Sequence, residues 1–87
     1  MTNKERAALL AAGEESLAFY EKGLDVNLQK ENYPMAWDYR CMYEGAVYML
    51  KSLGLISPED YQARSETAFD RYLNARYPEH VSEEAGT

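Results

Sequence analysis

The stretch that decides the fold is LGLISPED, residues 53–60. Its glycine, followed by an apolar leucine, is typical of a helix that ends in a left-handed residue. Ser57 can cap a second helix, with Pro58 at the first helical position and Asp60 three residues after the cap. One helix therefore ends and the next begins within residues 54–57, which predicts a tight antiparallel helix–loop–helix.

The segment before this turn is predicted to be a helix that begins at Pro34. Its expected core stripe is Met35, Tyr39, Met42, Ala46, Leu50 and Leu53. Further apolar bulk comes from Trp37, Tyr43, Val47, Tyr48 and Met49. A helix that is apolar nearly all round is buried from several sides, yet two neighbouring helices in so short a chain cannot cover it completely. Either some aromatic rings stay half exposed or a second copy covers them, and this predicts a homo-oligomer.

The first helix is expected to be capped by Thr2 or Asn3 and to end at Gly23-Leu24, with a polar connection at residues 25–32. Its core stripe is Leu10, Gly13, Leu17, Tyr20 and Leu24, and that of the third helix is Tyr61, Ser65, Ala68, Tyr72 and Ala75. The helices are expected at residues 3–22, 34–53 and 58–76, in one domain over residues 1–78 that is followed by a mobile acidic tail at 79–87. The predicted fold is an all-α three-helix bundle with a buried central helix.

The chain carries a formal net charge of −6, which is unevenly distributed. Residues 1–33 hold four basic and six acidic side chains, residues 34–56 two of each, and residues 57–87 three basic and seven acidic. Such a surface repels nucleic acid and attracts a basic protein surface. Because the chain shows neither a signal-peptide pattern nor a long apolar span, we expect a cytoplasmic protein that binds no membrane.

No catalytic group is evident, and neither a cofactor nor a metal site is expected. The only histidine, His80, falls in the predicted tail, and the only cysteine, Cys41, is expected to be a buried and inert thiol. Arg40 and Glu44 have the spacing of an ion pair on one helix, although a polar spot in an interface is the alternative. Candidate binding residues are Trp37, Tyr39, Arg40, Tyr43, Glu44, Tyr48, Tyr61, Arg64, Arg71 and Tyr72.

Arginine near tyrosine is a combination that binds flat or anionic ligands, and Arg64 and Arg71 lie seven residues apart on the third helix. The interleaved acidic residues favour an alternative in which both arginines belong to an ion-paired face. Gly45 indicates either a close backbone crossing or a surface that tolerates glycine.

The segment YEGAVYMLKSLGLISPEDY, residues 43–61, resembles a helical hairpin of small accessory proteins from bacterial phages and mobile elements. That resemblance implies an anti-defence role, such as stoichiometric inhibition of the anti-CRISPR kind. We therefore expect a non-enzymatic binding protein whose partner is a protein with a basic surface or a second copy. An oligomeric sponge for signalling nucleotides and a purely structural helical assembly module remain the alternatives.

Overall fold

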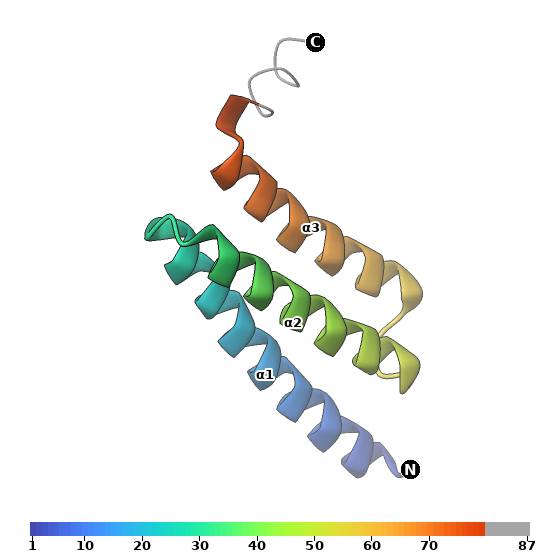
Figure 1. Cartoon of the computed structure of the whole chain (residues 1–87). Coiled ribbons are helices and arrows are strands. Elements are labelled where there is room, and N and C mark those ends of the chain that lie inside the picture. Colours follow the sequence, from blue (N-terminus) through green and yellow to red (C-terminus); the bar gives the residue numbers. More distant parts are fainter. Residues whose placement is uncertain (80–87) are drawn as a thin grey trace.

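The computed structural model describes residues 1–79, which fold into three helices with no strand among them. The helices are α1 (Asn3–Gln29), α2 (Tyr33–Ser52) and α3 (Pro58–Arg76). Helix α2 lies between the other two and runs opposite to both, so α1 and α3 are parallel (Figure 1). The all-α three-helix fold is therefore confirmed. Its principal dimensions are 49 × 29 × 13 Å, so the helices form a nearly flat layer.

The end of α1 differs from the prediction. The helix does not stop before Gly23 but continues to Gln29, so most of the expected connection at residues 25–32 is helical. A Cβ at Gly23 would lie 2.4 Å from the ring of Tyr39. The glycine therefore allows the ring from α2 to approach the α1 backbone, and it does not end the helix.

The observed end of α1 has the hydrogen bonds that are usual where a helix ends at a glycine, but the residue in that position is not glycine. Glu31 occupies the left-handed position, with φ 57°. Its N–H bonds to the carbonyl of Leu28 at 3.1 Å, and the N–H of Asn32 bonds to the carbonyl of Asn27 at 2.8 Å. This is the Schellman pattern, in which a glutamate takes the place that glycine usually fills. Asn32 also caps α2, because its side chain accepts a hydrogen bond from the backbone N–H of Met35 in the first turn.

The turn between α2 and α3 forms as predicted. Gly54 has φ 71°, and its N–H and that of Leu55 each bond to an α2 carbonyl at 2.9 Å. The side chain of Ser57 accepts the N–H of Asp60 at 3.0 Å, and Pro58 is the first helical residue. Arg6 at the start of α1 donates to the carbonyl of Gly54, which ties the turn to the first helix.

The core lies between α2 and its two neighbours. It consists of Leu17, Leu24, Ala36, Tyr43, Val47, Leu50, Leu55, Ala68 and Tyr72. The stripes predicted for the first and third helices supply most of the α1 and α3 members. For α2 half of the predicted stripe is wrong, because Met35, Met42 and Leu53 are 41%, 42% and 49% exposed. The other half is confirmed, since Leu50 is in the core and Tyr39 and Ala46 pack against it. A helix that is apolar all round does not reveal from its sequence which side faces the core.

Candidate functional site

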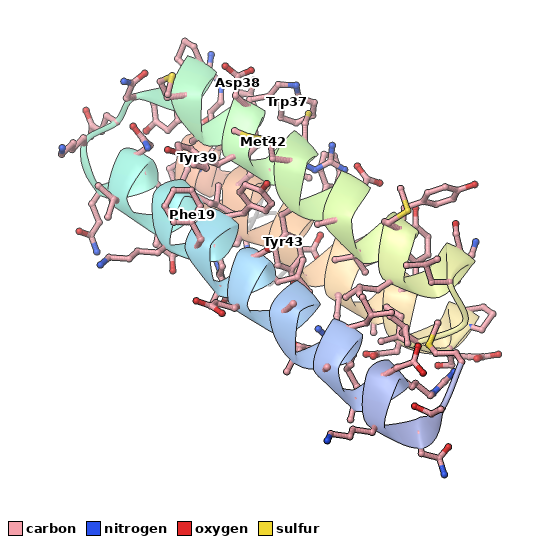
Figure 2. All side chains as sticks on the ribbon, turned by 90° about the horizontal axis from the view of Figure 1, so that it is seen from below. Phe19, Trp37, Asp38, Tyr39, Met42 and Tyr43 are labelled. Atoms are coloured by element: carbon pink, nitrogen blue, oxygen red, sulfur yellow. The ribbon has the colours of Figure 1, made fainter. Side chains whose placement is uncertain are left out.

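The most distinctive surface is the side of α2 that faces away from α1 and α3, which we call the outer face. It comprises every exposed residue between positions 35 and 53: Met35, Trp37, Asp38, Cys41, Met42, Gly45, Tyr48, Met49, Ser52 and Leu53. Asp38 is the only charged residue among these ten. Figure 2 shows Trp37, Asp38 and Met42 on the outside of α2, whereas Tyr43 lies among the three helices.

The outer face is large for a surface of so small a chain. Its six large apolar side chains, those of Met35, Trp37, Met42, Tyr48, Met49 and Leu53, are between 38% and 58% exposed. If each presents about 200 Å² when fully exposed, the six together present roughly 550 Å². This value is at the upper end of the range of about 300–600 Å² for the largest apolar patch on a monomer, and patches of that size are often functional.

Two small residues lie within this surface. Apart from the local helix backbone and its two chain neighbours, Gly45 has no described atom within 4 Å of the place where a Cβ would stand. Of the two interpretations of this glycine, the structure therefore favours an open surface within a single chain. Cys41 is exposed, so the expectation of a buried thiol is wrong. The reason is the orientation of α2 about its own axis, which turns the side that carries both Cys41 and Met42 away from the core.

Aromatic contacts flank the outer face on both sides. On the α1 side, Phe19 meets the ring of Tyr39 at 6.4 Å between centroids, and Phe19 is itself 64% exposed (Figure 2). On the α3 side, Trp37 packs edge to face on Tyr72 at 5.0 Å and on Phe69 at 6.2 Å. The apolar surface of α2 thus continues onto both neighbouring helices.

Arg40 lies on the α3 side of α2 and is largely covered. Its guanidinium is 4.8 Å from the ring centroids of both Trp37 and Phe69, and it pairs with Glu44 at 2.9 Å. The predicted ion pair on the helix is therefore present. The Nε of Arg40 is buried and has no hydrogen-bond partner. Contact with the ring faces and the pair with Glu44 together hold the cation in this position.

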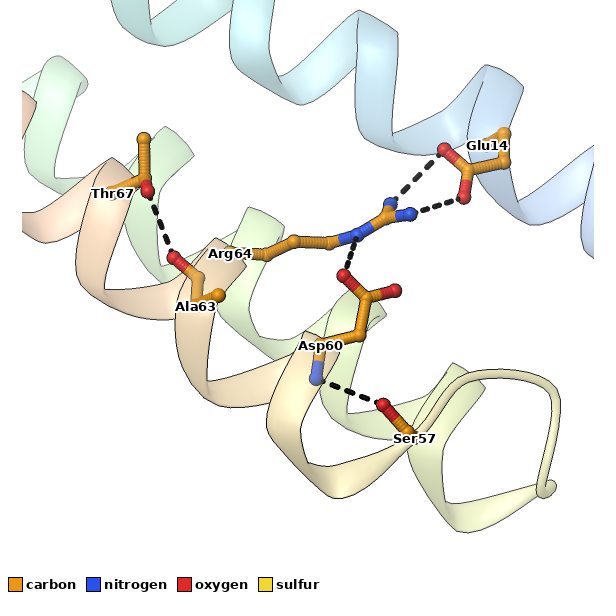
Figure 3. Close-up of polar contacts among 6 residues, drawn as sticks. All are labelled: Glu14, Ser57, Asp60, Ala63, Arg64 and Thr67. Carbon is orange, nitrogen blue, oxygen red and sulfur yellow. Dashed lines mark hydrogen bonds and ion pairs between the residues drawn. The ribbon is translucent and has the colours of Figure 1, made fainter.

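The arginines of α3 form a polar seam with α1. Arg64 binds Glu14 through two nitrogens at 2.9 and 3.0 Å, and its Nε binds Asp60 at 3.1 Å (Figure 3). Seven residues further along both helices, Arg71 binds Glu21 at 3.1 Å and also contacts Asp25 at 3.3 Å. Both arginines are thus occupied by carboxylates of their own chain, which favours the ion-paired interpretation over an anion site.

The seam changes the protonation equilibria of its members. The hydrogen bond to Glu14 raises the pKa of Arg64 above its usual value. Burial alone would lower the pKa of Arg71, but the hydrogen bond to Glu21 and the charge of Asp25 outweigh it and the pKa is raised. Both side chains are therefore permanent cations. Burial, and secondarily the charge of Glu21, raises the pKa of Tyr43, which lies beneath the seam.

A shallow aromatic groove of about 480 Å³ opens where the start of α2 meets the end of α3. It is lined by Tyr33, Pro34, Trp37, Phe69, Tyr72, Leu73, Arg76 and Tyr77. The guanidinium of Arg76 lies 4.6 Å from the ring centroid of Tyr33 and 5.4 Å from that of Tyr77. The groove shares Trp37 with the outer face of α2 and extends that surface toward α3.

The candidate residues predicted from the sequence do not form one site. Trp37 and Tyr48 belong to the outer face. Tyr39, Tyr43 and Tyr72 pack between helices, Arg40 and Glu44 pair along α2, and Arg64 and Arg71 belong to the seam. Tyr61 meets the ring of Tyr48 at 5.9 Å, and Lys51 lies 4.8 Å from the Tyr61 centroid.

Sequence reasoning missed the aliphatic part of the outer face. The periodicity places Met35, Met42 and Leu53 in the core stripe, and it gives Met49 only as additional apolar bulk outside that stripe. What identifies the face in the sequence is the scarcity of charged and polar residues. On the helix side centred on Gly45, from position 35 to 53, only Asp38 and Ser52 interrupt the apolar residues.

Within the part of the chain that the structure describes, no group of side chains has the composition of a metal site. None of the helices there has both the length and the apolar character needed to cross a membrane. His80 and most of the predicted tail lie outside residues 1–79. Comparison of the chain with protein-family models, with curated proteins and with solved structures finds no match.

Proposed function

We propose that this chain is a non-enzymatic protein-binding module and that the outer face of α2 is its binding surface. One observation carries the proposal: the ten exposed residues between positions 35 and 53, which form one side of α2 and its C-cap, include a single charge. Apolar side chains gathered on one exposed helix side are typical of surfaces that bind another protein.

The distribution of charge supports a protein partner rather than a nucleotide. Arg64 and Arg71 would be the phosphate-binding groups of a nucleotide sponge, but each already pairs with two carboxylates. A phosphate would have to displace Glu14 or Glu21 from these arginines and would meet their negative charge. The contacts therefore favour protein binding over the nucleotide alternative.

The resemblance to phage accessory proteins gives this function a specific form, which is inhibition of a host defence protein by stoichiometric binding. The acidic first and last thirds of the chain would draw a basic surface toward it and make the association sensitive to salt. The apolar outer face would then supply the short-range contact.

The test compares three immobilised proteins in extract of the host cell. The first is the natural chain, the second carries Met42→Glu with Met49→Glu on the outer face, and the third carries Ala63→Glu with Asn74→Glu at exposed positions of α3. The two variants add the same charge. We expect a protein that the natural chain and the α3 variant retain and that the outer-face variant loses. Equal retention by all three would refute the assignment of the surface.

A further inference from the structure

We infer that the occupant of the outer face is a second copy of this chain, paired antiparallel along α2 about a twofold axis at Gly45. This inference rests on the proposed function, because it concerns the same surface: the free chain pairs with its own copy through the outer face, and a host protein would bind there by displacing that copy. Four observations carry it: the area of the face, the shape of the molecule, the order of residues about Gly45, and the position of the charges.

The area fits a dimer interface. The six large apolar side chains present roughly 550 Å², and a standard interface buries about 800 Å² on each partner. Cys41, Gly45, Asp38 and Ser52 add exposed surface between them, and Phe19 extends the area onto α1. The molecule is a layer only 13 Å thick, so its broad side can meet another copy without obstruction. Face-to-face pairing would turn one layer of helices into two layers with a shared core.

The order of residues about Gly45 makes the face self-complementary. Met42 and Met49 lie on the α1 edge of the face, whereas Cys41 and Tyr48 lie on the α3 edge, because residues seven apart share a helix side. An antiparallel twofold arrangement that sets Gly45 on the partner's Gly45 brings Met42 beside the partner's Met49. On the other edge it brings Cys41 beside the partner's Tyr48. Apolar groups thus meet apolar groups on both edges.

The positions of the charged residues favour an antiparallel over a parallel arrangement of the two α2 helices. A parallel twofold pair would place Asp38 against the partner's Asp38, which opposes like charges in a poorly solvated interface. The antiparallel pair places Asp38 level with the partner's Ser52, in the last helical turn of α2, which also carries Lys51. The segment 34–56 is also the only neutral third of the chain, so two acidic molecules meet there with the least repulsion.

The absence of a side chain at Gly45 allows the two helices to approach closely. Apart from its own helix backbone and its two chain neighbours, no described atom lies within 4 Å of its would-be Cβ, so the space above it is open to a partner. Glycine in a helix interior costs about 1 kcal/mol relative to alanine in a single chain. Close packing of two α2 backbones at this point is a reason for its presence that a monomer does not provide.

Disulfide formation tests the register. In the antiparallel pair the two native Cys41 residues lie about 12 Å apart along the helix axis, which is too far for a disulfide. The variant Tyr48→Cys places a second thiol beside the partner's Cys41, while the two thiols within one chain remain about 10 Å apart. Under mild oxidation we expect the natural chain to stay uncrosslinked and Y48C to form a covalent dimer.

The matched control carries Tyr48→Cys together with Cys41→Ser. It leaves one thiol per chain, about 9 Å along the axis from its partner, and should form no dimer. Crosslinking of the natural chain through Cys41 would overturn the antiparallel register, because it places the two Cys41 residues side by side. Crosslinking of the control to the same extent as Y48C would overturn it too.

Sedimentation separates this inference from the function on which it rests. We expect a concentration-dependent dimer that Met42→Glu with Met49→Glu weakens by about 100-fold or more, since unpaired charges would be buried. A natural chain that sediments as a monomer at millimolar concentration overturns self-pairing. If that monomer still retains a host protein through its outer face, the proposed function stands. If it retains none, both fail.

Discussion

The substitution Glu31→Gly is expected to stabilise the protein. Glu31 follows the C-cap of α1 with φ 57°, a left-handed conformation that costs an L-residue roughly 1–2 kcal/mol. Glycine removes that strain, although its greater freedom in the unfolded chain takes back about 0.5–1 kcal/mol. The expected net gain is about 0.5–1 kcal/mol in the free energy of unfolding, or roughly 3–6 °C in Tm for a chain of this size.

Two controls isolate the backbone as the cause. Glu31→Ala removes the same charge but keeps the strain, so it should leave the stability within about 0.5 kcal/mol of the natural chain. Lys30→Gly places glycine at the preceding residue, which has φ −84°, and should destabilise by up to about 1 kcal/mol. Urea unfolding followed by circular dichroism gives the three values. A gain in Glu31→Ala equal to that in Glu31→Gly would show that charge, and not backbone strain, is responsible.

Three further outcomes are expected. Gly45→Ala should raise the free energy of unfolding by up to about 1 kcal/mol at concentrations that keep the chain monomeric, because the place of the new Cβ is open. Gly23→Ala should lower it by about 1 kcal/mol, because the ring of Tyr39 occupies the place of the new Cβ. Urea melts that gave the opposite signs would contradict this packing. A double-mutant cycle of Glu14→Gln and Arg64→Gln should give a coupling of about 0.5–1 kcal/mol that shrinks in 1 M salt; a coupling unchanged by salt would count against the seam as an exposed ion pair. Because the folded chain keeps the Tyr43 proton to higher pH than the unfolded chain, stability should fall as the pH rises above about 10, and Tyr43→Phe should flatten that fall in melts across this range; an unchanged fall would exclude Tyr43 as its source.

The parts of the fold that short-range chemistry determines could be predicted from the sequence. The turn before α3 is such a part, because Gly54 needs a left-handed conformation and Ser57 supplies a cap next to Pro58. The end of α1 could not be predicted in the same way. Gly23 has the local signature of an ending but is explained by a ring from α2, and the real ending uses Glu31, a residue type that rarely adopts this conformation.

The candidate site was predicted only in outline. An excess of apolar surface on α2 follows from its composition, and that excess is present. Which residues carry it depends on the rotation of the helix about its axis, and rotation is set by packing against two neighbours. Ala36 and Val47 are fully buried and so mark the inward side of α2, which leaves Met42 and Met49 on the outward side. Nothing in the period of the sequence distinguishes the two sides.

The seam between α1 and α3 has an ambiguity built into its spacing. The spacing between successive partners is the same on both helices. The acceptors on α1, Glu14 and Glu21, are seven residues apart, and so are the donors on α3, Arg64 and Arg71. If one helix slid along the other by seven residues, about 10.5 Å, Arg64 would therefore lie beside Glu21 and one ion pair would form again. The ion pairs alone cannot specify how α1 and α3 are aligned along their axes. The short turn around Gly54 fixes this alignment, because it limits where α3 can begin. An insertion in that turn would consequently free the third helix to settle in more than one position.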